Sequence, residues 1–145
     1  MKKVLITAGC MLLLLLPVCA QRAIIGKWMS SDNNLQVEVY QLGLEFRAKV
    51  TWFDDTDNKN EPMATRCDTK NPDKRLRNRK VVGLEVLQGL VYNADDDEWQ
   101  DGRIYDPSTG KDWNAKAWLT KEGILKVRGY WHFTLFGQNM SFKRV

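Results

Sequence analysis

Hydrophobic and polar residues alternate one by one along most of the chain after residue 20. The clearest run covers residues 44–52, where every second residue is hydrophobic: Leu44, Phe46, Ala48, Val50 and Trp52. A period of two is the pattern of a β-strand with one buried face and one solvent-exposed face. The 3.6-residue period of an amphipathic helix is not sustained anywhere in this part of the chain. The sequence therefore predicts an all-β protein.

Runs of this kind predict eight or nine strands. The joints between them are short and rich in Asp, Asn and Gly, so successive strands should be antiparallel neighbours in a meander. A closed barrel leaves no unpaired strand edge, and we favour it over a two-sheet sandwich. Gly83 and Gly89 predict a bulge or sharp bend in the longest hydrophobic run. The expected strands span residues 24–30, 35–42, 44–53, 81–87, 87–92, 98–105, 112–120, 124–132 and 138–144.

Residues 54–80 do not fit the alternating pattern, because they are polar, charged and contain proline. They predict a long loop with a helical turn around residues 74–79. The second half of this loop, Arg66 to Lys80, is basic, with Asp68 and Asp73 as its only acids. It either faces solvent or meets phosphate head groups, polyanionic sugars or an acidic envelope partner. No aromatic residues interleave the cations, so we expect no nucleic-acid partner.

The first twenty residues have the pattern of a cleaved secretory signal peptide. Lys2 and Lys3 precede a hydrophobic run over 4–16, and small residues precede Gln21. The run is short for a membrane span. Cleavage leaves a single domain over residues 21–145, exported and soluble in the periplasm or outside a bacterial cell, and lowers the net charge from +4 to +2. Lipidation of Cys19 is less favoured, because Val18 precedes it where a small residue is required.

Cysteine content gives a separate constraint. Cys67 is the one cysteine that remains after cleavage, so an internal disulfide is excluded. The alternatives are a buried thiol that packs as a small hydrophobic group, a reactive thiol or an intermolecular disulfide. We favour the buried thiol.

The tryptophans bear on whether the barrel is filled. Trp28, Trp52, Trp113 and Trp131 fall on hydrophobic faces, whereas Trp99 and Trp118 fall on mixed or polar ones. Small residues share the inward face and leave space beside the large rings. They are Ala48, Ala115, Ala117 and Gly129. A barrel of about eight strands encloses one small ligand or is packed with side chains, and both alternatives remain open.

No recognisable catalytic motif is present in the chain. His132 is the only histidine and belongs to a polar strand face, which indicates a rim position. The acidic runs 54–58 and 95–98 lack the spacing of a calcium loop, and Gly110-Lys111 lacks that of a phosphate loop. We expect no metal, no cofactor and no enzymatic activity. A hydrolase that uses carboxylates at the barrel mouth is the weakest alternative.

Two resemblances follow from short motifs. Gly26-x-Trp28 near the start of the first strand, with Arg144 near the end of the last, resembles the calycin barrels, the lipocalins and fatty-acid-binding proteins. The resemblance implies that the Arg144 guanidinium packs across the Trp28 ring and closes the barrel.

A longer series resembles the exported bacterial domain-of-unknown-function family 2147. This resemblance implies a small barrel-like fold, an exported location and a fixed role for Arg77 and Arg79, but no established activity. Lys80 and Trp113 depart from the family pattern, and residues 136–142 lack an expected Arg and Trp. The matching elements, in order, are Asn71-Pro72-Asp73, Leu76-Arg77-x-Arg79, Gly83-Leu84, the segment 102–111 and Leu125-x-Val127-Arg128-Gly129-Tyr130.

The leading functional hypothesis is a barrel that binds a small apolar or amphipathic ligand. The meander gathers aromatic rings, two cations and one carboxylate in one region, which suits an amphipathic molecule with an anionic head. In the alternative, Asp106 caps its own turn and Arg128 lies in solvent. A second hypothesis is a packed, non-enzymatic envelope interaction module that uses the basic loop with exposed Trp99 and Trp118. The candidate ligand-binding residues are Tyr105, Asp106, Lys111, Trp113, Arg128 and Tyr130.

Overall fold

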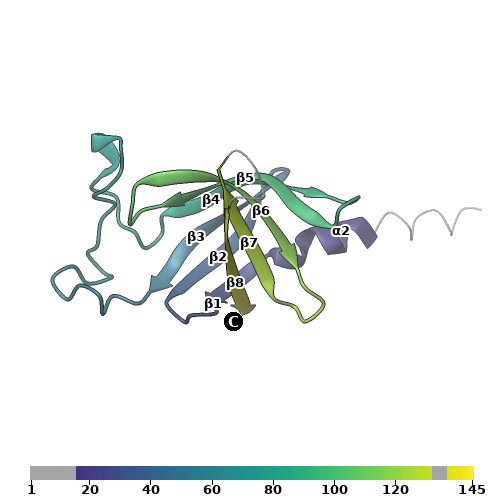
Figure 1. Ribbon diagram of the computed structural model, residues 1–145, viewed down its shortest axis with the longest axis horizontal. Helices are drawn as coiled ribbons and strands as arrows, with labels where there is room; N and C mark the ends of the chain where they lie inside the picture. Colours follow the sequence, from purple (N-terminus) through teal and green to yellow (C-terminus); the bar gives the residue numbers. More distant parts are fainter. Residues whose placement is uncertain (1–15, 132–136) are drawn as a thin grey trace, which may run out of the picture.

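The computed structural model describes residues 16–131 and 137–145, which form a closed eight-stranded antiparallel barrel (Figure 1). Each strand pairs with the next along the chain, and β8 returns to β1. The predicted all-β class, meander and closure are confirmed. No helix among these residues is long and apolar enough to cross a membrane. The elements are α2 (Leu16–Gln21), η1 (Arg22–Ile24), β1 (Gly26–Ser30), β2 (Leu35–Leu42), β3 (Glu45–Phe53), η2 (Lys74–Leu76), β4 (Glu85–Asn93), β5 (Glu98–Asp106), β6 (Lys111–Leu119), β7 (Leu125–Tyr130) and β8 (Gly137–Arg144).

The fourth strand decides between the two predicted strand counts in favour of eight and corrects two of the predicted ranges. Separate strands over 81–87 and 87–92 are wrong, because β4 is continuous from Glu85 to Asn93. Gly83 has a positive φ of 88° and lies in a turn ahead of the strand. Gly89 also has a positive φ, 75°, but the register shifts there without ending the strand. The glycine therefore marks a bulge within one strand.

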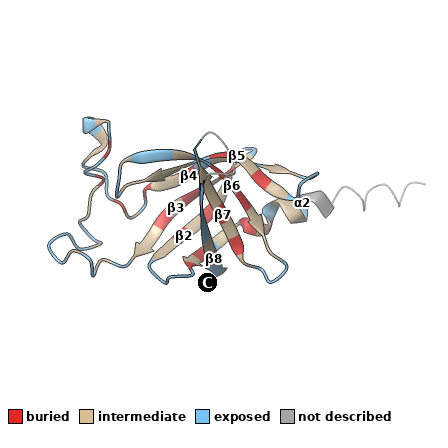
Figure 2. Ribbon diagram, viewed as in Figure 1, coloured by how far each residue is buried: buried red, intermediate tan, exposed pale blue. Residues whose placement is uncertain are grey.

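Trp99 corrects the predicted core. Its expected place on a mixed or polar face is wrong, because the residue is only 1% exposed. Figure 2 marks the buried stretches of the barrel strands in red. Asp101 adopts a left-handed φ of 62°, and the β5–β6 register shifts between Trp99 and Gly102. This bulge places both residues inward although they are three positions apart. The Trp99 ring packs edge-on against Phe46, with 6.4 Å between ring centroids.

Trp131 differs from its prediction in the opposite direction, because it was expected in the core and is exposed. The strand predicted over 124–132 ends at Tyr130, so the alternation does not extend to Trp131. Its side chain is 60% exposed, and the prediction that it faces the core is wrong. Trp52 and Trp113 are half-buried, between these extremes.

Arg144 and Trp28 join the last strand to the first. They are paired in the β1–β8 ladder, and the guanidinium carbon lies 4.3 Å from the centroid of the buried Trp28 ring. Arg144 also donates hydrogen bonds to the carbonyls of Ile25, at 2.8 Å, and Ala23. Gly26 has a φ of 133°, and a Cβ there would lie 2.6 Å from Nη1 of Arg144. The closure contact implied by the calycin resemblance is therefore present.

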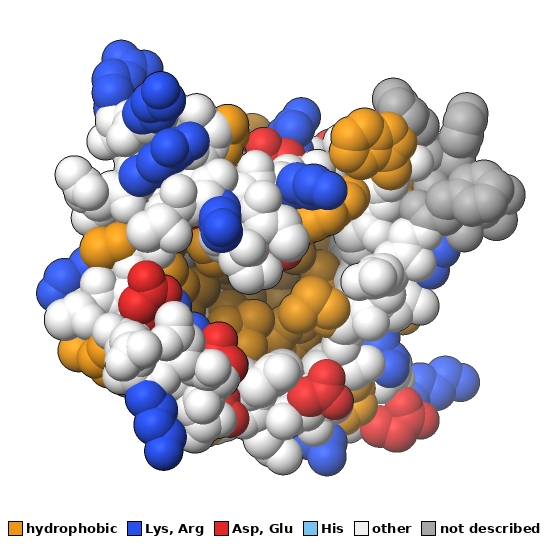
Figure 3. All heavy atoms as spheres, turned by 60° about the vertical axis from the view of Figure 1, so that its left-hand side comes forward, with side chains coloured by type: hydrophobic (Ala, Val, Ile, Leu, Met, Phe, Trp, Pro, Cys, Tyr) orange, Lys and Arg blue, Asp and Glu red, His pale blue; other side chains and the backbone are white. Residues whose placement is uncertain are grey.

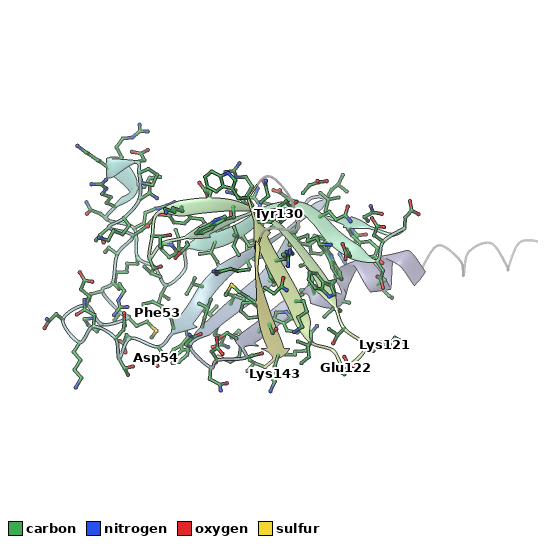
Figure 4. The ribbon with its side chains drawn as sticks, in the orientation of Figure 1. Phe53, Asp54, Lys121, Glu122, Tyr130 and Lys143 are labelled. Atoms are coloured by element: carbon green, nitrogen blue, oxygen red, sulfur yellow. The ribbon has the colours of Figure 1, made fainter. Side chains whose placement is uncertain are left out.

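The meander gives the barrel two different ends. We call the end with the long loop the open end and the end with α2 the closed end; they lie at the left and right of Figure 1. Figure 4 marks them with Phe53 and Asp54, where β3 leaves the barrel, and with Lys121 and Glu122 in the β6–β7 turn. The open end carries residues 31–34, 54–84 and 107–110, and the closed end carries 43–44, 94–97 and 120–124.

Candidate functional site

The inner face of the barrel changes from closely packed to open along its strands. Near the closed end, Leu125, Val127 and Phe142 are at most 4% exposed. Met140 lies two residues before Phe142 on the same face of β8, yet it is 38% exposed. Figure 3 looks toward the open end and shows a hollow with hydrophobic side chains at its base. We call this hollow the mouth, and it is the candidate ligand site.

Gly129 shows that the wall of the mouth has room for larger groups. It faces inward on β7, opposite Ala115 of β6 and Gln138 of β8. A Cβ on Gly129 would meet Ile104 at 3.6 Å and Trp113 at 3.8 Å, which are ordinary contact distances. On β5, a Cβ on Gly102, which pairs with Ala115, would lie 2.6 Å from Leu90, so the interior beside Gly102 is already filled. The free space on this wall therefore lies beside Gly129 of β7.

Two of the predicted ligand-binding residues are engaged elsewhere. The Asp106 carboxylate accepts hydrogen bonds from the amide and hydroxyl of Ser108, at 2.8 and 2.7 Å, and from the Thr109 hydroxyl at 2.8 Å. It caps its own turn, as the alternative interpretation has it. Arg128 donates to Asn139 Oδ1 at 2.9 Å, between β7 and β8. Its strand neighbours Val127 and Gly129 face inward, so Arg128 faces outward and does not reach the mouth.

Tyr105 is also engaged, with a residue that the sequence analysis did not nominate. Its hydroxyl donates a 2.5 Å hydrogen bond to Oδ1 of Asp68, whose residue exposure is 0%. Asn71 and Arg79 donate to Oδ2 of the same carboxylate, at 2.8 and 3.1 Å. Burial first, and then the hydrogen bond to this carboxylate, raises the pKa of Tyr105 to about 12. Tyr105 is thus a neutral donor that ties the long loop to β5.

The family motifs meet at this attachment point. Arg77 donates from Nε to the Asn71 carbonyl at 2.7 Å, and the Asp68 amide donates to the Arg79 carbonyl at 2.8 Å. Gly110, with a φ of 72°, lies against the Lys70 carbonyl so closely that a Cβ could not be accommodated. Motifs far apart in the sequence thus fix the basic loop on the 107–110 turn. The fixed role that the resemblance implies for Arg77 and Arg79 is consistent with these contacts.

The basic loop keeps exposed positive charge beside the mouth. Arg66, Arg75 and Arg79 form ion pairs with Asp57, Asp73 and Asp68. Three exposed lysines of the loop form no ion pair with any described residue: Lys70, Lys74 and Lys80. Figure 3 shows Lys and Arg side chains gathered on one side of the hollow, with acidic side chains on another part of the rim.

Lys111, Trp113 and Tyr130 lie at the open end of the β6–β7 wall. Lys111 begins β6 and is exposed, and Trp113 follows it on the same face of the strand. Trp113 and Tyr130 also line a shallow pocket of about 150 Å³ in the barrel wall. The structure thus keeps two of the six predicted residues, Lys111 and Trp113, on the inner face near the mouth. Tyr130 faces outward like Arg128, because the residue between them, Gly129, faces inward. Tyr105, Asp106 and Arg128 serve the contacts described above.

The acidic, cysteine and histidine side chains can also be compared with the arrangements that metal sites and reactive groups require. No group of three or more His, Cys, Asp or Glu side chains within residues 16–131 and 137–145 is arranged to hold a metal ion. Cys67 is half-buried rather than buried, and its thiol donates to the Thr65 carbonyl at 3.2 Å. The Asp54 carboxylate accepts from the Thr56 amide, which lowers its pKa. His132 lies outside the described residues.

Comparison with known proteins supports the family and the fold. The family described as "Uncharacterized protein conserved in bacteria (DUF2147)" matches residues 26–144. Among solved structures, the chain is similar to protein HP1028 from Helicobacter pylori, which is described as belonging to the lipocalin family. The two are 20% identical with a TM-score of 0.70, over 84% of this chain and 82% of that chain. At this identity the likeness concerns the fold alone. No curated protein matches the chain.

Proposed function

Since the chain belongs to the DUF2147 family and closes into a lipocalin-like barrel, we propose that it binds a small apolar or amphipathic molecule in the mouth. The observation that carries the proposal is the change in burial along one inner face, from Phe142 at 4% exposure to Met140 at 38%. Barrels of this size hold one small ligand where side chains do not fill them. Binding rather than catalysis is the activity that we propose.

The ligand that we favour has an apolar body and an anionic head. Ile104, Trp113 and Met140 supply apolar wall on the inner face. Lys111 is exposed at the start of β6, and Lys70 of the basic loop lies close to it, because the Lys70 carbonyl packs against Gly110. Charge-assisted hydrogen bonds from ammonium groups to a carboxylate or phosphate are stronger than those between neutral groups. The cations would therefore orient the head outward while the body enters the barrel.

Export is part of the same proposal. We infer that residues 1–20 are removed and that the protein acts in the periplasm or outside the cell. Cleavage before Gln21 would leave the described core intact, because its first buried residue is Ile24. It would also retain the Gln21 carbonyl, which accepts a 3.1 Å hydrogen bond from the Trp99 indole.

A pair of fluorescent probes tests the binding proposal. We expect saturable binding of a long-chain fatty-acid analogue and of the matching alcohol, with the acid bound more tightly. Gly129→Leu adds bulk inside the mouth. It should raise the Kd of both probes about tenfold or more, which corresponds to about 1.4 kcal/mol. Gln88→Leu adds the same side chain at an exposed position of β4 and should leave binding unchanged. Absence of saturable binding to the wild type by either probe contradicts the proposal.

A second candidate function is an interaction module that uses the basic loop. The favouring observation is that Lys70, Lys74 and Lys80 remain exposed on a loop that Asp68 holds in place. In this case no lipid probe saturates the mouth. The protein would instead be retained on an anionic resin, and replacing the three lysines with glutamine would abolish that retention.

A further inference from the structure

Three side chains form a row across the outside of the barrel wall. Asn114 of β6 is paired with Arg103 of β5 on one side and with Tyr130 of β7 on the other. Ala115, the next residue, is fully buried and faces inward, so Asn114 and its two partners face outward. This row therefore lies on the other side of the sheet from the mouth, near the open end of the strands.

The row belongs to a shallow pocket with an aromatic border. The pocket has a volume of about 150 Å³ and is lined by Arg103, Asp112, Trp113, Asn114, Tyr130 and Trp131. Drug-sized ligands occupy pockets of roughly 300 Å³ or more, so this one suits a single ring. A tryptophan with 60% of its surface exposed beside polar side chains is a common feature of binding surfaces.

The polar groups of this pocket are available to a ligand. Arg103 and Asp112 lie 3.9 Å apart, beyond hydrogen-bond distance, and both are exposed. Among the described residues, the side chains of Arg103, Asp112 and Asn114 have no hydrogen-bond partner, in contrast to Asp106 and Asp68. The guanidinium donates, the carboxylate accepts, and the amide does both. One cation and one anion balance each other, which favours a neutral ligand rich in hydroxyl groups.

We propose that this wall pocket binds one pyranose ring of a neutral oligosaccharide. The ring offers an apolar C–H face that packs on an aromatic side chain, and its hydroxyl groups both donate and accept hydrogen bonds. Trp131 and Tyr130 match the first property, and Arg103, Asp112 and Asn114 match the second. A fatty acyl chain would leave the polar groups without partners, and an anionic ligand would face the Asp112 carboxylate. The proposal is independent of ligand binding in the mouth.

Titration calorimetry with cellotetraose, maltotetraose and chitotetraose tests the proposal on the full mature chain. We expect saturable binding of at least one of them with a Kd on the order of 1 mM, as suits a single-ring subsite. Trp131→Ala and Asn114→Ala should each weaken it by about fivefold or more. Trp118→Ala removes a tryptophan from the same outer wall, where Lys116 lies 5.4 Å from its ring centroid, and should leave binding unchanged.

Both test positions are at least partly solvent-exposed, so the variants should keep the wild-type Tm, and this is measured alongside. Weakening in both variants but not in Trp118→Ala supports the pocket. Binding that either variant retains in full, or no saturable binding of any of the three sugars at about ten times the expected Kd, overturns the proposal.

Discussion

The hydroxyl of Tyr105 donates a 2.5 Å hydrogen bond to the fully buried carboxylate of Asp68. Burial of a carboxylate is costly unless hydrogen bonds or opposite charges compensate it, and Asn71 and Arg79 complete that compensation here. The one buried acid of the basic loop thus becomes its attachment point to β5. The position of Lys70 against the 107–110 turn depends on this attachment.

Replacing Tyr105 with phenylalanine should destabilise the protein by about 1–3 kcal/mol, because Asp68 stays buried with one donor fewer. Urea unfolding measures the change. Limited proteolysis should cut the Tyr105→Phe variant within residues 66–80 faster than the wild type. Tyr92→Phe is the matched control, since the Tyr92 hydroxyl also donates to a carboxylate, Asp97, but in an exposed turn. Equal stability losses in the two variants would contradict the anchoring role of Asp68.

The same contact predicts a dependence on alkaline pH. Burial and Asp68 raise the pKa of Tyr105 from 10.0 to about 12 in the folded state. Folding therefore favours the neutral phenol. The contribution of the Tyr105–Asp68 hydrogen bond to the free energy of unfolding is complete below pH 10 and is lost as the pH rises toward 12. The difference in unfolding free energy between the wild type and Tyr105→Phe should narrow over that interval. A difference that stays constant would show that the phenol does not titrate with this contact.

Gly110 provides a test of how the loop is seated. Its φ is 72°, and a Cβ would collide with the Lys70 carbonyl. Gly43 has a similar φ of 63° but open space around it. Both alanine variants bear the backbone strain of about 1 kcal/mol, whereas only Gly110→Ala must also displace the loop. We expect Gly110→Ala to cost about 2 kcal/mol more than Gly43→Ala in thermal or urea unfolding. Similar losses in both would indicate that the loop adjusts freely.

The alternating pattern was sufficient to predict the meander, because each strand has one buried face and each joint is short. It failed in β5, where a residue other than glycine takes the left-handed conformation that shifts the alternation. Asp101 adopts a left-handed φ of 62°, and this single residue moves Trp99 from the expected outer face into the core. Propensity alone does not identify such a bulge, because aspartate is common in ordinary turns as well.

The candidate site was predicted only in part for a related reason. Lys111 and Trp113 follow from the alternation, since they share the inward face of β6 with Ala115. The meander placed Tyr130 on the neighbouring strand correctly, but on the outer side of the sheet. Asp68 could not be found in this way, because the composition of residues 54–80 indicates a solvated loop. The available signal was that Asp68 is one of only two acids in a basic run that also carries the family motifs. The partner of Asp68, Tyr105, is 37 positions away in the sequence. The two residues meet only because the loop folds back onto the barrel, and local sequence does not encode that contact.

Closure of the barrel by Arg144 gives the last prediction. Arg144→Ala removes the guanidinium above the Trp28 ring and the donors to the Ala23 and Ile25 carbonyls, and should cost about 1–3 kcal/mol. Arg144→Lys keeps the charge but has no planar group to stack, so it should recover less than half of the loss. Lys143→Ala changes the exposed neighbouring residue and should have little effect. Urea unfolding of the three variants measures these differences. A loss below a few tenths of a kcal/mol for Arg144→Ala would mean that pairing of β1 with β8 closes the barrel without this contact.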